Sequence, residues 1–148
     1  MASSPNGPSN TVRQYITTPY LKQAHNAFEP LFKDNIDVAV INIAHEDLSR
    51  YSLVVVPGLY LLDQAGADAL RKFVSNGGTA IMTAYSAKVN ENNQWYDTPL
   101  PGRLTDVFGL RTSEFYDAGK VMTRLGDEDL EGEIGFYEVL EPSSAEVL

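Results

Sequence analysis

The sequence contains no cysteine among its 148 residues and only two histidines, His25 and His45. Disulfide bonds, thiolate nucleophiles and cysteine metal sites are therefore excluded. His45-Glu46 begins like the zinc-protease pattern H-E-x-x-H, but Ser49 stands where the second histidine is required. The loops G-x-G-x-x-G and G-x-x-x-x-G-K-S/T, which bind phosphates through backbone N–H groups, are also absent. The sequence therefore predicts neither a metal nor a cofactor.

Long hydrophobic runs are absent as well. None approaches the ~18 apolar residues that suggest a membrane-spanning helix, so a membrane is not a predicted partner. The first ten residues, MASSPNGPSN, lack a basic segment followed by an apolar core, which predicts that this chain has no signal peptide. We expect a soluble protein, and the sequence is compatible with either a cytoplasmic or a periplasmic parent.

Basic residues are missing from the last part of the chain. Up to Leu125 there are 12 acidic and 11 basic residues, whereas from Gly126 onward there are 8 acidic residues and no Lys or Arg. Nucleic acid requires a basic face and is therefore not a predicted partner. We expect the acidic segment, residues 126–141, to be a solvated loop with an exposed strand face. A protein-interaction module is the alternative for this segment.

Residues 51–89 carry the clearest structural pattern in the chain. Leu53–Val56 is an apolar run with three β-branched residues, which is typical of a strand buried on both faces of a parallel sheet. Asp63 is placed to cap a helix whose apolar positions recur every three or four residues until the glycines at 77 and 78. Residues 79–83 are a second apolar strand. Because a β-helix-β unit in one sheet needs a parallel crossover, the pattern predicts a layered α/β domain.

The rest of the chain shows shorter patterns. They predict a flexible N-terminal arm over 1–17 and a single α/β domain over 18–148. Within this domain they predict a helix from Pro19, which kinks or ends near Phe28 because of Pro30. A strand over 37–41 is expected after it. Beyond residue 85 they predict a polar loop over 86–101, a short helix over 102–108, an extended segment over 112–116, and a hairpin of 120–125 with 135–140. No strand precedes the first helix and the last residues begin another element, so we expect a fragment truncated at both ends of its sheet.

Three stretches resemble one enzyme family: VVVPGLYLLDQAGADALRKFVSNGGTAIMT, SAKVNENNQWYD and PLPGRLTDVFGLRTSEFY. Over residues 36–117 the chain resembles the middle, or trimerisation, domain of family 42 β-galactosidases, whose fold is similar to that of class I glutamine amidotransferases. The resemblance implies a flavodoxin-like or amidotransferase-like doubly wound, mostly parallel sheet. It also implies a non-catalytic domain of a glycoside hydrolase of carbohydrate metabolism, which self-associates as a trimer.

The same resemblance implies where the catalysis of such a parent enzyme takes place. In the family, the catalytic glutamates lie on a separate (β/α)8 barrel, which is too large for 148 residues. The barrel of the parent chain is therefore an implied partner, and no catalytic residue carries over onto this chain. We expect this chain itself not to be an enzyme.

Ser86 defines an alternative function. It follows the second predicted strand, where amidotransferase relatives carry their nucleophile, and Pro57-Gly58 ends the first strand, where open α/β sheets bind ligands. However, Tyr85 and Lys88 are too large for the small-residue surroundings of a nucleophile elbow, and no histidine follows His45 to act as base. A small-molecule-binding or amidotransferase-like enzyme domain is thus the second hypothesis.

Aromatic residues outside the regular core pattern are the candidates for a binding surface. Such residues are typical anchors of protein interfaces, and arginines commonly supply hydrogen bonds around them. The interface candidates are Trp95, Tyr96, Phe115 and Tyr116, with Arg103 and Arg111 at the rim. The alternative interpretation is local packing of the long loop onto the domain.

Overall fold

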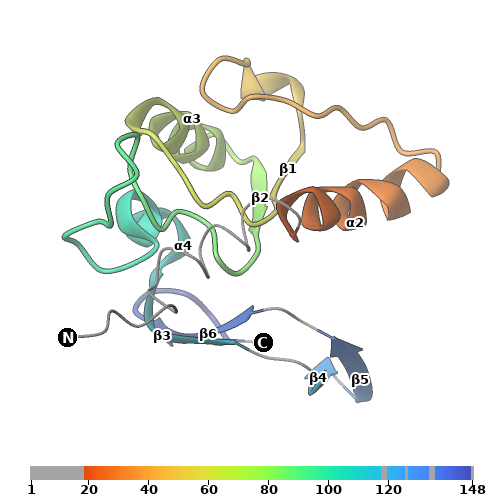
Figure 1. Ribbon diagram of the computed structural model, residues 1–148. Helices are drawn as coiled ribbons and strands as arrows, with labels where there is room; N and C mark the ends of the chain where they lie inside the picture. The colour runs from red at the N-terminus through yellow and green to blue at the C-terminus, as the bar shows by residue number, and fades with distance from the viewer. Residues whose placement is uncertain (1–18, 118–119, 126, 134–135, 148) are drawn as a thin grey trace, which may run out of the picture. The chain divides into compact units, whose positions relative to one another are not determined.

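The computed structural model describes residues 19–117, 120–125, 127–133 and 136–147 (Figure 1). The predicted arm over 1–17 lies outside the described residues. The chain divides into two compact units, Met1–Ile41 and Asn42–Leu148, and each is described by itself. None of the helices in the described ranges is long and apolar enough to cross a membrane.

The described part of the first unit is dominated by one helix, α2, which spans Pro19–Lys33 (Figure 1). Of the two predicted outcomes near Phe28, a kink or a helix end, the end is wrong, because the helix continues through Pro30. A proline removes only its own N–H from the hydrogen-bond ladder, and the next turn is kept by the Asp34 N–H, which donates to the Pro30 carbonyl at 3.1 Å. The rings of Phe28 and Phe32 stack across this turn with centroids 5.5 Å apart.

The predicted strand over 37–41 is not formed. These residues have no regular secondary structure, and the Val40 side chain is 87% exposed. An isolated extended segment gains no ladder of hydrogen bonds, and none of the strand pairs in the described residues includes this one. The alternating apolar pattern was therefore not sufficient to form a strand without a neighbour.

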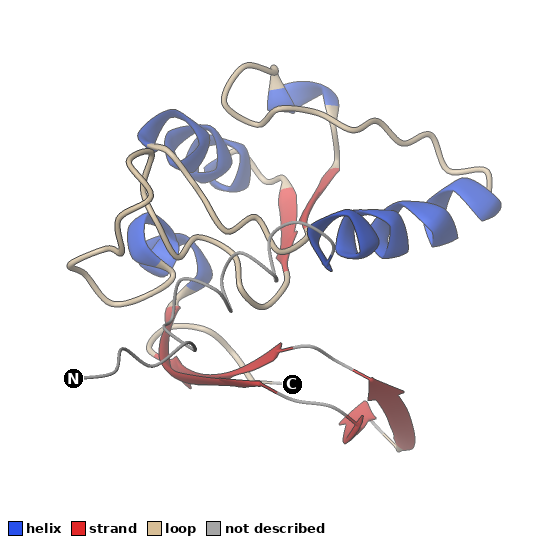
Figure 2. Cartoon of the chain, viewed as in Figure 1, coloured by secondary structure: helices blue, strands red, loops and turns tan. Residues whose placement is uncertain are grey.

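The second unit contains the predicted β-helix-β element (Figure 2). Strand β1, Leu53–Val56, pairs in parallel with β2, Thr79–Met82, and helix α3, Gln64–Ser75, connects them. Asp63 caps α3 as predicted, since its carboxylate accepts a hydrogen bond from the Gly66 N–H at 2.7 Å. Helix α3 packs against β2 and against the short 3-10 helices η1, Leu48–Arg50, and η2, Gly102–Leu104. The core side chains here include Val54, Val56, Ala67, Leu70 and Phe73.

The parallel sheet is smaller and less buried than predicted. In the described residues the sheet has two strands. Along each strand, more buried side chains alternate with more exposed ones, so the two faces of the sheet are not equally covered. Val54 and Val56 are buried, whereas Ile81 on β2 is 50% exposed. Alternation of this kind is the pattern of a sheet with one covered face. The described residues therefore do not form the wider doubly wound sheet, although they do combine helices and strands.

The segment after β2 is an irregular loop that is tied to the core. The Leu62 N–H donates to the Val89 carbonyl at 3.1 Å, and Val89 also forms an isolated bridge with Trp95. The predicted short helix over 102–108 is confirmed as η2 followed by α4, Thr105–Phe108. Leu104 is fully buried.

The C-terminal strands pair differently from the prediction. β3, Leu110–Asp117, which contains the predicted extended segment, pairs antiparallel with β6, Phe136–Pro142. β4, Lys120–Leu125, pairs with β5, Glu128–Glu133, so the predicted hairpin of 120–125 with 135–140 is wrong. Only two residues separate β4 from β5, and closing so short a connection costs less entropy than closing a longer one.

The described residues of the acidic segment 126–141 are mostly strand, because they form β5 and most of β6. The loop part of the prediction is therefore wrong for these residues, whereas the exposed strand face is seen on β6, where Tyr137, Val139 and Leu140 are each at least 40% exposed. The charge of the segment is partly compensated within the hairpin. The Arg124 Nε atom on β4 donates to Asp129 Oδ1 on β5 at 2.8 Å, across a pair of directly opposed residues. Opposite charges facing each other in this way support antiparallel pairing, although an exposed pair contributes only modestly.

Candidate functional site

Four aromatic rings of the second unit form one cluster, which we call the aromatic patch: Tyr60, Tyr85, Trp95 and Phe115. Trp95 stacks on Phe115 with ring centroids 5.8 Å apart, and Tyr60 stacks on Tyr85 at 5.3 Å. Edge contacts join the two pairs, from Tyr60 to Trp95 at 6.3 Å and from Tyr85 to Phe115 at 6.5 Å. Such separations are within the range at which aromatic rings attract one another.

The aromatic patch is buried on one side and open on the other. Tyr60 and Tyr85 belong to the buried core, whereas Trp95 is 44% and Phe115 41% exposed. The buried pair comes from the loops that follow β1 and β2, and Phe115 comes from β3. These rings therefore pack locally and still present an apolar surface to solvent, while their role in an interface stays a prediction.

Tyr96 and Arg103 form a separate site at the start of η2. The Tyr96 hydroxyl donates to the Leu62 carbonyl, and the Arg103 guanidinium lies over the Tyr96 ring, 5.3 Å from its centroid. Arg103 also forms an ion pair with Glu91 at 2.9 Å. Burial raises the pKa of the Tyr96 hydroxyl, and the hydrogen bond from Arg103 lowers the pKa of Glu91. A carboxyl held ionised in this way is unsuited to act as a general acid.

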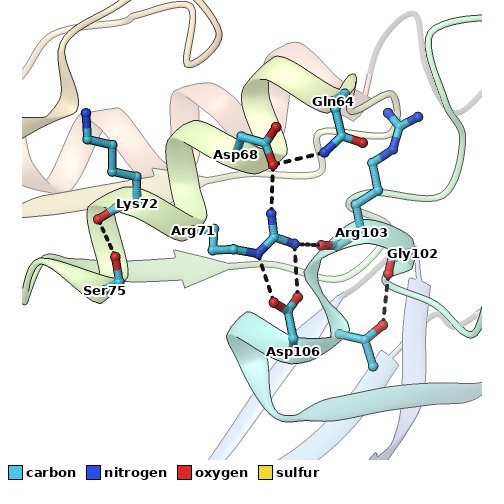
Figure 3. A network of polar contacts seen from close by, with 9 residues as sticks. Gln64, Asp68, Arg71, Lys72, Ser75, Gly102, Arg103 and Asp106 are labelled. Atoms are coloured by element: carbon cyan, nitrogen blue, oxygen red, sulfur yellow. Dashed lines mark hydrogen bonds and ion pairs between the residues drawn. The ribbon is translucent and has the colours of Figure 1, made fainter.

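A polar network centred on Arg71 connects this site to α3 (Figure 3). The Arg71 guanidinium donates from Nε to Asp106 Oδ2 at 2.8 Å and from Nη1 to Asp68 Oδ1 at 2.8 Å. It also donates to the backbone carbonyl of Arg103. The hydrogen bond from Arg71 lowers the pKa of Asp106. The network thus joins α3 to η2 and α4 and fixes the segment that carries Arg103.

Tyr116 and Arg111 lie on the opposite face of the β3–β6 pair from Phe115. Phe115 is directly opposite Glu138 in the register, whereas Tyr116 is opposite Tyr137, and neighbouring residues of a strand point to opposite faces. The Tyr116 and Tyr137 rings stack at 5.2 Å, and both are exposed. Arg111 Nε donates to Glu141 Oε2 at 2.7 Å. Tyr137 was not a sequence candidate, because the wrong hairpin gave it a different neighbour.

The six candidates therefore occupy three places: Trp95 and Phe115 in the aromatic patch, Tyr96 and Arg103 beside η2, and Tyr116 and Arg111 on the other face of β3–β6. Only the first pair and Tyr116 combine exposure with aromatic contact area. The Tyr96 hydroxyl is bonded to the Leu62 carbonyl, so this ring packs locally, and its role in an interface stays a prediction.

The geometry at Ser86 does not favour the alternative enzyme function. Ser86 is only 2% exposed, and its hydroxyl accepts from the Leu59 N–H at 3.1 Å and donates to the Val56 carbonyl at 3.3 Å. The Gly58 N–H, in the turn after β1, donates to the Thr83 hydroxyl at 2.8 Å. Both polar groups at this end of the sheet are thus used to hold the backbone. In the described residues, no group of three or more His, Asp or Glu side chains is arranged to hold a metal ion.

Comparison with known proteins agrees with this geometry. A family model described as the β-galactosidase trimerisation domain matches residues 3–148. β-Galactosidase BgaA of Planococcus sp. (strain 'SOS Orange') is 35% identical over 99 residues, which are 67% of this chain and 14% of that protein. β-Galactosidase BglY of Alicyclobacillus acidocaldarius is 30% identical over 138 residues, covering 91% of this chain and 19% of that protein.

A solved structure is similar over nearly the whole chain. The crystal structure of β-galactosidase from Bacillus circulans sp. alkalophilus superposes with a TM-score of 0.82 and 28% identity, covering 99% of this chain and 22% of that one. The chain spans less than a fifth of the length of the two curated relatives that it matches. The family match over residues 3–148 and these relatives identify the chain as a member of the β-galactosidase trimerisation domain family.

Proposed function

We propose that this chain serves as a non-catalytic self-association domain of a β-galactosidase-like glycoside hydrolase, which it assembles into a closed trimer. The partners are other copies of the chain and the catalytic barrel of the parent polypeptide. The proposed activity of the parent follows from the relatives, which are described as β-galactosidases.

The observation that carries this proposal is the half-exposed stack of Trp95 on Phe115. Two large rings, each with more than two fifths of its surface open, lie over a buried aromatic base. Aromatic anchors that are rigidly held and partly exposed are the residues that contribute most to protein interfaces, about 2 kcal/mol or more each when desolvated. The aromatic patch is therefore our proposed contact surface for a second copy.

A second surface on the same ribbon suits head-to-tail assembly. A cyclic trimer needs two different patches that meet, because each copy uses one patch toward each neighbour. The Tyr116–Tyr137 stack lies on the opposite face of β3–β6 from Phe115, with Arg111 and Glu141 on the same strands. We propose these two faces as the two sides of the contact.

The finer fold assignment is also a proposal. We infer that β1, α3 and β2 belong to a doubly wound, amidotransferase-like sheet, of which the parallel pair is the part seen here. Its support is the parallel register from Leu53–Thr79 to Val56–Met82 and the tight turn at Gly58, which has a φ of 58°. The division into an arm over 1–17 and a single domain over 18–148 likewise stays a prediction.

Replacing Trp95 tests the proposed contact. Trp95→Ala is expected to weaken self-association about tenfold or more, because it removes an exposed anchor of the patch. Gln94→Ala is the matched control, since it shortens the neighbouring exposed side chain and leaves the rings in place. Sedimentation velocity over a concentration series gives the association constants, and circular dichroism checks the fold.

Trp95→Phe completes the comparison, because it keeps an aromatic ring of smaller area. Its association constant should lie between those of the wild type and Trp95→Ala. Equal self-association of the wild type and a folded Trp95→Ala variant would contradict the proposal, and would assign Trp95 to local packing alone.

A further inference from the structure

Lys88 is a buried charge that the proposed function does not use. Its side chain has no exposed surface, although it lies in the loop after β2 next to the aromatic patch. Burial lowers the pKa of the Lys88 ammonium, and the attraction of Glu138 opposes this effect. Lys88 Nζ forms an ion pair with Glu138 Oε1 at 2.7 Å. Among the described residues, this buried nitrogen has no partner in hydrogen-bonding geometry. Burying a charged lysine in this way destabilises the fold unless a nearby group compensates its charge.

The Glu138 carboxylate has other partners besides Lys88. Its Oε1 atom also accepts a hydrogen bond from the Tyr85 backbone N–H at 2.7 Å, and its Oε2 atom accepts one from the Thr112 hydroxyl at 3.1 Å. The carboxylate on β6 is thus held by β3 on one side and by the loop after β2 on the other. We call these four residues, Tyr85, Lys88, Thr112 and Glu138, the Glu138 junction.

The Glu138 junction is continuous with the aromatic patch. Tyr85 belongs to both, since its N–H binds Glu138 and its ring contacts Tyr60 and Phe115. Phe115 is directly opposite Glu138 in the antiparallel register, so both side chains leave the ribbon on the same face. Glu138, Tyr85 and Phe115 are therefore in direct succession: the carboxylate binds the Tyr85 backbone, and the Tyr85 ring contacts Phe115, which stacks on Trp95.

Charge compensation alone does not account for this arrangement. A single carboxylate beside Lys88 would neutralise it equally well from a flexible side chain. Here the acceptor is held by three groups from two segments, the loop after β2 and strand β3. The loop presents the Tyr85 N–H from a backbone with a φ of 68°, a conformation that non-glycine residues seldom adopt. Both partners of the pair are at most 9% exposed.

We propose that Glu138 is a positioning residue for the self-association surface: by joining β3–β6 to the loop after β2, it sets the Trp95–Phe115 stack in place. The consequence for assembly rests on the proposed function, whereas the consequence for the stack does not.

Trp95 makes the stack directly measurable, because it is the only tryptophan in the sequence. Acrylamide quenching of its fluorescence, at protein concentrations low enough that every variant is monomeric, reports how far Phe115 covers it. Glu138→Gln leaves Lys88 buried without its counter-charge, so the quenching constant should rise about twofold and self-association should weaken about tenfold. Glu146→Gln is the matched control, since it makes the same change at an exposed glutamate after β6 that belongs to neither proposed contact face.

Two further variants separate positioning from general stability. Lys88→Met combined with Glu138→Gln removes both charges and keeps an oxygen for the Tyr85 N–H, so it should restore the quenching constant to near the wild-type value. Thr112→Val removes one hydrogen bond to the carboxylate without changing the shape of the side chain, and should raise the quenching constant by a smaller amount than Glu138→Gln.

The outcomes decide the proposal independently of trimer formation. An unchanged quenching constant in folded Glu138→Gln, or in Thr112→Val if Glu138→Gln does not fold, overturns the positioning role. A lowered melting temperature with unchanged quenching also overturns it, because Glu138 would then be only a stabilising residue. A raised quenching constant in a chain whose wild type is monomeric supports the positioning role, while contradicting the proposed function.

Discussion

Two serine hydroxyls illustrate how this chain uses its polar side chains. Ser86 is buried and bonds to the backbone of two segments, at Leu59 and Val56, whereas the Ser75 hydroxyl is exposed and donates to the Lys72 carbonyl one turn earlier in its own helix. Removing a buried partner leaves a backbone N–H without an acceptor, while removing an exposed one lets water take its place.

Ser86→Ala is therefore expected to lower the free energy of unfolding by about 1–3 kcal/mol, and Ser75→Ala by less than about 0.5 kcal/mol. Urea unfolding of the two variants and the wild type measures the difference. An equal, small effect of both substitutions would mean that Ser86 does not hold the turn after β1. Turnover of a chromogenic galactoside or of glutamine that is lost in Ser86→Ala would instead support the enzyme alternative.

The Arg71–Asp106 pair predicts a pH dependence of stability. The hydrogen bond from Arg71 lowers the pKa of Asp106 in the folded chain, so the pair stabilises the fold above the pKa of an ordinary aspartate and loses this effect as the pH falls through the lowered pKa. Because both side chains are partly exposed, we expect a modest contribution of about 0.5–1 kcal/mol near neutral pH.

Asp106→Asn should therefore be less stable than the wild type at pH 6 to 7, with a difference that shrinks as the pH falls below about 4. Thermal melts between about pH 2.5 and 7 measure this. Arg71→Met should show the same pH dependence, because it removes the other partner. A stability difference that does not change with pH would contradict the role of the ion pair.

At the scale of elements, two glycines with positive φ make a matched pair. Gly77, at the end of α3, has a φ of 91° and open space around an added Cβ atom. Gly102, at the start of η2, has a φ of 56°, and an added Cβ atom would overlap the Tyr96 ring. The first position is restricted by backbone conformation alone, and the second by backbone conformation and packing.

We expect Gly77→Ala to cost about 1 kcal/mol of stability and Gly102→Ala about 2–4 kcal/mol. The larger effect arises because the Tyr96 ring must move, which breaks the bond from its hydroxyl to Leu62 and the contact with Arg103. Chemical denaturation gives both values. Equal costs would show that Tyr96 is free to move aside, and that the site beside η2 is less rigid than its contacts indicate.

The elements that sequence reasoning predicted correctly are those specified locally. From Leu53 to Met82, the strands, the helix, its cap and the glycine turn are each specified by residues that are close to them in the sequence. The strand over 37–41 failed because its pattern had no described neighbour to pair with. The hairpin from 120 failed because charged residues of β5 were interpreted as a turn, although Asp129 opposes Arg124 across the ladder.

At the scale of the whole molecule, the candidate surface was predictable in composition but not in arrangement. Trp95, Phe115 and Tyr116 were recognised as aromatics outside the core pattern, yet nothing in their spacing places Phe115 on Trp95 and Tyr116 on the opposite face. That division depends on the β3–β6 register and its irregularity between Thr112 and Glu114. Tyr137 and Glu138 were missed for the same reason, since they acquire their roles only from β6 pairing with β3.

The central claim is that this chain self-associates as a trimer through surfaces of the second unit. Sedimentation equilibrium of the purified chain across about three decades of concentration measures its mass without reference to shape. The account predicts a mass that rises with concentration toward three times that of one chain, and that rises less in Trp95→Ala. A mass that stays at one chain throughout, or that stops at two, would contradict it.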